Sequence, residues 1–149
     1  APTAMSYKRL QPASLSGYWR NWGGDHRNVT TRVSAEGGAK SRLEHRMADA
    51  SANPYIAVAA ALQAALLGVQ EGYALPDRET GDGFELTDAT EGVAADLAGA
   101  IDDLRADSVL ADAVGRMLVD NQLFMREAEV DKTADMDHTA LRDFYIPFL

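Results

Sequence analysis

The amino-acid sequence predicts an α+β fold in which part of an antiparallel sheet is followed by C-terminal helices. Residues 1–50 contain short β-branched, alternating stretches separated by glycine-rich turns, which is typical of strands. From residue 53 onward the chain is rich in Ala and Leu, and its apolar residues recur at helical spacing. A chain of 149 residues that is 46% hydrophobic is one globular domain or part of one.

Two stretches in the first third are expected to pair as an antiparallel hairpin. NVTTRV, at residues 28–33, is β-branched and alternates, and SRLEHRM, at residues 41–47, follows it. The EGGAK segment between them is a turn signal. A hairpin alone is marginally stable in water, so the pattern indicates a piece of a longer protein.

The first long helix is expected over residues 55–69. Asn53 is a good N-cap, Pro54 suits the first helical position, and the stretch is apolar nearly all round, so we expect it to be buried. Residues 74–90 form a polar loop, and the acidic residues of 77–91 are interpreted as solvated surface. Further helices are expected at 91–105, at 108–130 with Asp107 or Ser108 as cap, and at 138–145.

Charge is distributed unevenly along the chain. Residues 1–46 hold eight Lys or Arg against three Asp or Glu, whereas residues 47–149 hold six against twenty. The acidic remainder argues against a general nucleic-acid binder, which would be basic over a broad face. No apolar run is long enough to span a membrane. The absence of cysteine excludes disulfides and Cys-ligated zinc, and it is compatible with the cytoplasm.

The segment RLEHR places Arg42, Glu44 and Arg46 at alternating positions, so in a strand they share one face. Arginine binds carboxylate and phosphate groups through two parallel hydrogen bonds, and a glutamate can ligate a hard cation such as Mg²⁺. Taken on composition alone, these charges are more simply interpreted as surface ion pairs.

Four blocks shift this interpretation: SYKRLQP, WGGDHRNVTTRV, SRLEHR and ANPYIAVAAALQAALLGV, in that order. Together they resemble the C-terminal part of the catalytic domain of the glutamine synthetase family. The family pattern runs N-S-Y-K-R-L-x-P-G, N-R-S-x-x-x-R, R-x-E-x-R and A-N-P-Y before an Ala/Leu-rich helix. The resemblance is specific over residues 1 to about 72 and weaker beyond. It implies strands and a flap in 1–50, mainly helices in 53–149, and an N-terminal β-grasp domain and catalytic strands that lie upstream of this chain.

The resemblance also implies roles for single residues. Glu44, as the Glu of R-x-E-x-R, would ligate one of two divalent metals, Mg²⁺ or Mn²⁺. Arg9 and Arg46 would bind the substrate glutamate. Four further cations would bind ATP phosphates: Arg27, Arg42, Arg32 and Lys40. Of these, Arg27 and Arg42 would also be catalytic.

The implied reaction is that of glutamine biosynthesis, a ligation step of nitrogen metabolism. The γ-carboxylate of glutamate attacks the γ-phosphorus of ATP, and an amine, ammonia in the parent enzyme, then displaces phosphate from γ-glutamyl phosphate. Family members are cytoplasmic homo-oligomers built as double rings. Because this chain supplies one metal ligand where the family uses several, we expect it to be inactive by itself.

One departure from the family pattern keeps a second activity open. The ammonia-using enzymes carry a flap Glu six residues after the Arg of S-Y-K-R-L, and Leu15 stands there in this chain. An apolar flap suits a bulkier amine, as in relatives that make γ-glutamyl amides of amines or polyamines. A truncated, non-catalytic module that binds a nucleotide or a partner is a third interpretation.

Overall fold

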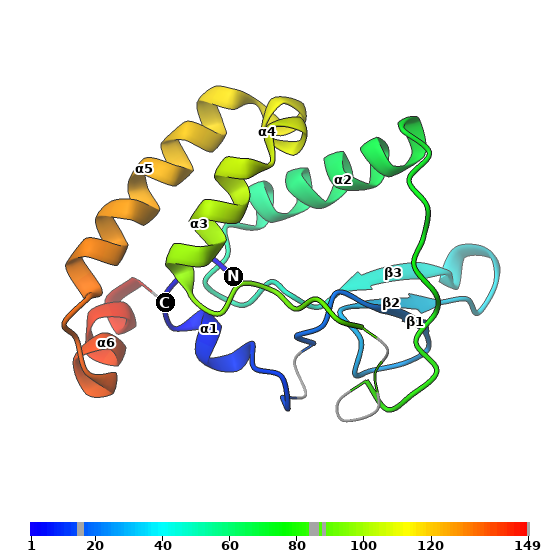
Figure 1. Ribbon diagram of the computed structural model, residues 1–149, viewed down its shortest axis with the longest axis horizontal. Helices are drawn as coiled ribbons and strands as arrows, with labels where there is room; N and C mark the ends of the chain where they lie inside the picture. Colours follow the sequence, from blue (N-terminus) through cyan, green and yellow to red (C-terminus); the bar gives the residue numbers. More distant parts are fainter. Residues whose placement is uncertain (15–16, 84–86, 88, 149) are drawn as a thin grey trace.

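The computed structural model describes residues 1–14, 17–83, 87 and 89–148 (Figure 1). Its elements confirm the α+β class. The strands are β1 (Trp22–Gly24), β2 (Thr31–Ser34) and β3 (Arg42–His45), and the helices are α1 (Ser6–Arg9), α2 (Pro54–Gln70), α3 (Leu97–Ala106), α4 (Ser108–Val114), α5 (Arg116–Thr133) and α6 (His138–Tyr145), with 3₁₀ turns η1 (Gly38–Lys40) and η2 (Ile146–Phe148). Figure 1 shows the small sheet at one end of the molecule and α5 and α6 at the other.

The sheet has the strand order β1-β2-β3 and is mixed. β2 and β3 pair antiparallel, as predicted, with Arg32 opposite Glu44. β1 pairs parallel to β2, with Trp22 opposite Thr31, so the expectation of a purely antiparallel sheet is wrong for this edge. The sequence WGG gives no sign of this strand, because it is only three residues long and glycine is depleted in strands.

The first residues form a helix where strands were expected. α1 has one turn, and its Tyr7 side chain packs with Leu10, Leu97 and Ile101 in a buried apolar cluster. The Tyr7 hydroxyl donates to the carbonyl oxygen of Ala1 at 2.8 Å. One buried apolar cluster of the described residues therefore lies between α1 and α3, and further buried apolar side chains, such as Val29 and Val119, lie outside it.

Side-chain caps set the starts of the later helices. Asn53 Oδ1 accepts the backbone N–H of Tyr55 at 3.0 Å, which confirms the predicted start of α2. The helix expected at 91–105 begins only at Leu97, because Gly92 forms a bridge with Trp19 and Asp96 provides the cap. The stretch expected at 108–130 is split into α4 and α5 at a single residue.

The residue that separates α4 from α5 is Gly115, whose backbone φ of 114° lies where glycine is favoured over residues with a Cβ. α6 begins and ends at the predicted residues, with Asp137 Oδ1 accepting the backbone N–H of Ala140 at 2.8 Å. Within the described ranges no helix is long and apolar enough to cross a membrane.

The expectation that α2 is buried is wrong for this chain, since none of its residues is buried. α2 packs against α4, and apolar side chains on its remaining surface face solvent. The side chains most exposed are Tyr55, Val58, Leu62, Leu66 and Val69, of which Tyr55 is 84% and Val69 82% exposed. An all-round apolar sequence specifies burial only where enough neighbouring structure exists to cover it.

Candidate active site

Glu44 lies between two arginines, and each of its carboxylate oxygens faces one of them. The cross-strand partner Arg32 places Nη1 3.2 Å from Glu44 Oε2, and Arg46, just beyond β3, places Nε 3.4 Å from Oε1. Arg32 also reaches Asp25 Oδ1 at 3.2 Å. The Arg32 side chain is 15% exposed and that of Glu44 is 41% exposed, so the carboxylate stays accessible from solvent while the guanidinium is largely enclosed.

Arg9 is tied to the segment that carries Arg46. From the last residue of α1, Nη2 donates to the carbonyl oxygens of Met47 at 2.9 Å and Ala48 at 3.4 Å, and Nη1 donates to that of Arg46 at 3.5 Å. These bonds fix α1 against the end of β3. The two arginines expected to bind glutamate therefore come from adjoining segments.

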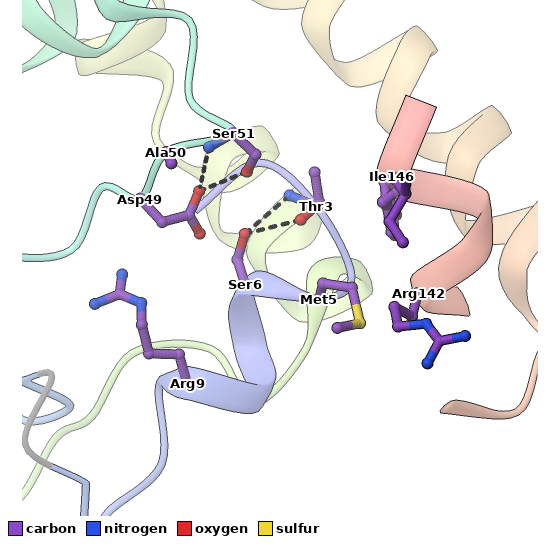
Figure 2. A pocket seen from close by; sticks show the side chains of 10 residues that line it. Thr3, Met5, Ser6, Arg9, Asp49, Ala50, Ser51, Arg142 and Ile146 are labelled. Carbon is purple, nitrogen blue, oxygen red and sulfur yellow. Dashed lines mark hydrogen bonds between the residues drawn. The ribbon is translucent and has the colours of Figure 1, made fainter. Parts of the chain in front are cut away.

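A cavity of about 250 Å³ opens beside Arg9. In Figure 2, Arg9 and Asp49 lie on one side of it, and Met5, Arg142 and Ile146 lie toward the other. Asp49 Oδ1 accepts hydrogen bonds from the backbone N–H of Ser51 at 3.0 Å and from its hydroxyl at 2.5 Å, which fixes the turn before α2. The cavity thus borders the Arg9 end of the candidate site.

The other predicted side chains lie apart from Glu44. Arg42 pairs with Glu36 at 3.3 Å and donates to the carbonyl oxygen of Lys40 at 3.1 Å, so it does not contact Glu44 although both lie on β3. Lys40 is exposed in η1, and Arg27 is exposed on the turn between β1 and β2. The structure therefore joins four predicted residues, Arg9, Arg32, Glu44 and Arg46, and leaves three at the edge.

Glu44 suits a hard divalent cation, because carboxylate oxygens are the ligands that Mg²⁺ and Mn²⁺ prefer. Among the described residues no group of three or more His, Cys, Asp or Glu side chains is arranged to hold a metal ion. This part of the chain therefore offers Glu44 as one candidate ligand and not a complete cage.

The 74–90 loop contains a buried acid that sequence patterns did not indicate. Glu79 is 7% exposed, so the interpretation of all the loop acids as solvated surface is wrong for this residue. Burial by itself would raise the pKa of Glu79, but hydrogen bonds from Thr87, Gly81 and Asn21 outweigh it and lower the pKa. A glutamate in a polar loop gives no sequence signal of burial, because only tertiary contacts enclose it.

Comparison with known proteins identifies the family to which this chain and its fold belong. A family profile described as the catalytic domain of glutamine synthetase matches residues 1–145. A glutamine synthetase of Methanocaldococcus jannaschii is 34% identical over 136 residues, which cover 87% of this chain and 30% of that protein. A gamma-glutamylpolyamine synthetase of Streptomyces coelicolor is 31% identical over 163 residues, covering 97% of this chain and 33% of that protein.

The crystal structure of a novel glutamine synthase homolog superposes with a TM-score of 0.78 at 30% identity, and the match covers all of this chain and 34% of that one. The chain belongs to the glutamine synthetase family. It corresponds to part of the catalytic domain and spans about a third of the length of the relatives that it matches.

Proposed function

We propose that the protein containing this chain is an ATP-dependent ligase that joins an amine to the γ-carboxylate of glutamate through γ-glutamyl phosphate. The observation that carries the proposal is the Glu44 carboxylate held between Arg32 and Arg46, with Arg9 bound to the same segment, in a chain of the glutamine synthetase family. Several guanidinium groups beside one accessible carboxylate suit anionic substrates together with a divalent cation.

Each side chain has a task in this proposal. Arg9 and Arg46 bind the substrate glutamate, and Glu44 is a ligand of Mg²⁺ or Mn²⁺, which neutralises phosphate charge when bound. The remaining four cations bind phosphate oxygens of ATP: Arg27, Arg42, Arg32 and Lys40. Arg27 and Arg42 also stabilise the transferring phosphoryl group.

The reaction proceeds in two steps that both benefit from fixed positive charge. An oxygen of the glutamate γ-carboxylate attacks the γ-phosphorus, and ADP leaves. The amine nitrogen then attacks the acyl carbon, phosphate leaves, and the nitrogen loses a proton. Negative charge spreads over the phosphoryl oxygens in the first step, where preorganised guanidinium groups stabilise it.

Ammonia is the first candidate for the amine, and an alkyl amine or polyamine is the second. Leu15, which lies outside the described residues, favours the second candidate, and so does the similarity to the S. coelicolor gamma-glutamylpolyamine synthetase. We further propose that the full protein works as a homo-oligomeric double ring in the cytoplasm, as family resemblance implies.

The test uses the intact protein and measures phosphate release and γ-glutamyl product with ATP, glutamate, Mg²⁺ or Mn²⁺ and one amine at a time. We expect turnover that requires all four components. Binding of ATP without turnover under every combination would instead support a non-catalytic nucleotide-binding protein.

A further inference from the structure

The turn that carries Arg27 is held on both sides by the 74–90 loop. Nε2 of His26 lies 2.6 Å from the carbonyl oxygen of Gly81, and Nδ2 of Asn28 donates to the carbonyl oxygen of Asp82 at 2.7 Å. Between these anchors, the exposed Arg27 side chain makes no hydrogen bond or ion pair with any residue that the structure describes. The backbone of Arg27 is thus fixed while its guanidinium is left to bind something else.

The proton on His26 can be placed from its partners. Nδ1 accepts the backbone N–H of Asn28 at 3.2 Å, and a carbonyl oxygen can only accept, so Nε2 carries the proton and donates to Gly81. The imidazole of His26 therefore links the turn to the loop through both of its ring nitrogens. The loop approaches closely, since a Cβ added at Gly83 would lie 3.0 Å from the Cβ of Asn28.

Glu79 fixes the loop in the position where these anchors reach it. Its Oε1 accepts the backbone N–H of Gly81 at 2.8 Å, and its Oε2 accepts Asn21 Nδ2 at 3.1 Å and the Thr87 hydroxyl at 2.5 Å. The backbone N–H of Glu79 also donates to the carbonyl oxygen of Trp22 at 2.9 Å, which aligns the loop along β1. All the side-chain partners are donors, as an ionised carboxylate requires.

The network continues from Glu79 into the sheet. Asn21 Oδ1 accepts the backbone N–H of Thr30 at 3.1 Å, which fixes the direction of the Asn21 amide and so commits its Nδ2 to Glu79. The backbone N–H of Arg46 in turn donates to the carbonyl oxygen of Thr30 at 2.9 Å. A single buried carboxylate therefore joins the loop, the Arg27 turn and the strand pair beside Glu44.

We propose that Glu79 is a positioning residue for Arg27. It holds the carbonyl groups of Gly81 and Asp82 where His26 and Asn28 bind them, and so presents the Arg27 guanidinium to the phosphates of ATP. Glu79 itself touches no substrate. The inference rests on the proposed function only in assigning ATP phosphates to Arg27.

The test is Glu79→Gln in the intact protein. The amide keeps the size of the side chain but turns an NH₂ group toward a donor, so at least one of the three bonds is lost. We expect the Kd for Mg·ATP, measured by calorimetry without glutamate, and the KM for ATP both to rise about tenfold, while the KM for glutamate changes less than about twofold. Arg27→Lys should likewise raise the Kd for Mg·ATP and the KM for ATP while leaving the KM for glutamate nearly unchanged.

A double-mutant cycle separates positioning from general stabilisation. If Glu79 acts through Arg27, Glu79→Gln should add little to the effect of Arg27→Lys on ATP binding, because residues that act as a unit are not additive. Asp77→Asn is the matched control, since Asp77 is an exposed acid of the same loop. Three outcomes would each overturn the proposal. The effects of Glu79→Gln and Arg27→Lys on the Kd for Mg·ATP could be fully additive, Asp77→Asn could raise this Kd as much as Glu79→Gln does, or Glu79→Gln could lower the Tm without changing ATP binding.

Two further outcomes distinguish this inference from the proposed function. Wild-type protein that binds ATP without ligase activity, with binding weakened by Glu79→Gln as predicted, would reject the ligase function and support the positioning role. Wild-type protein that does not bind ATP would overturn both. Should Glu79→Gln fail to fold, Asn28→Ala removes one anchor from the turn, and an unchanged Kd for Mg·ATP in that variant would overturn the positioning role.

Discussion

At the scale of single residues, the two oxygens of Glu44 are divided between arginines with different proposed tasks. Arg32 comes from the neighbouring strand and is largely enclosed, whereas Arg46 follows just beyond the end of the strand that carries Glu44. Removing the charge of Glu44 would leave two guanidinium groups facing each other across a neutral amide. Its substitution is therefore expected to act on cation binding and on the geometry of both arginines.

Arg46→Lys in the intact protein is expected to raise the KM for glutamate about tenfold or more with a smaller change in kcat. Lysine keeps the positive charge but loses the planar pair of donors that binds a carboxylate. Steady-state kinetics at varied glutamate measure the effect. Arg20→Lys is the control, because Arg20 is 63% exposed and pairs with Glu91, which is not a residue of the proposed site.

Glu44→Gln is expected instead to weaken Mg²⁺ or Mn²⁺ binding and to lower kcat, because an amide oxygen is a weaker ligand than a carboxylate and carries no charge. Metal titrations of activity and Mn²⁺ binding followed by electron paramagnetic resonance measure this directly. Equal loss of stability in both variants, with the kinetics of the folded fraction unchanged, would mean that Glu44 and Arg46 form only a surface ion pair.

Part of the site could be predicted from residue patterns. The predicted hairpin pairs β2 with β3, and alternation places Glu44 and Arg46 on one face, as their contact shows. The register that sets Arg32 opposite Glu44 was supplied by the structure. Arg42 shares the pattern but pairs with Glu36, because a turn residue within reach competes for its guanidinium. Glu79 could not be found, since its burial depends on a loop folding back over 58 residues to Asn21.

At the scale of secondary-structure elements, local chemistry decided which predictions held. α2 and α6 begin after residues whose side chains cap them, so their limits follow from short-range sequence. α1 is one turn long, and β1 is a three-residue parallel strand, so both depend on contacts with distant segments. The break between α4 and α5 depends on one backbone conformation, which is testable.

Gly115→Ala is expected to destabilise the chain by about 1 kcal/mol or more, because the residue adopts a φ of 114° that strains any side chain. Crowding would not contribute, since nothing lies within 4 Å of the position of an added Cβ. Gly68→Ala is the matched control. It also has open space, but it lies within α2, so it should stabilise by roughly 0.5–1 kcal/mol. Urea unfolding of the 149-residue chain measures both.

At the scale of the whole molecule, the proposed choice of amine rests on Leu15, which stands where the family pattern of the ammonia-using enzymes has a Glu. Ammonia is almost entirely ammonium near pH 7, so a site for it benefits from a negative group that attracts the cation and takes its proton. Leucine does neither, but it can pack against the methylene groups of an alkyl amine, at roughly 0.8 kcal/mol per buried CH₂.

If the proposed ligase activity holds, we expect the intact protein to use at least one primary alkyl amine with kcat/KM equal to or above that for ammonia, and Leu15→Glu to shift the preference toward ammonia. Phosphate release with ammonia, ethylamine, putrescine and spermine measures this, and Leu15→Met serves as the apolar control. A strong ammonia preference in the wild type that Leu15→Glu leaves unchanged would rule out the alkyl amine as the preferred substrate and leave plain glutamine synthesis clearly first.

The solvent-exposed apolar side chains of α2 should make the separate 149-residue polypeptide self-associate in solution. Exposed leucine, valine and tyrosine side chains along one helix form an apolar surface that associates with other copies of the chain and binds hydrophobic dyes. Light scattering should therefore rise with protein concentration, and ANS fluorescence should be strong at native pH. The double substitution Leu62→Glu and Leu66→Glu should abolish both the concentration-dependent scattering and the ANS fluorescence, while the circular dichroism spectrum stays helical. Ala59→Glu is the control, because it adds a charge at a half-buried position of the same helix without removing an exposed leucine. It should leave more of the ANS binding.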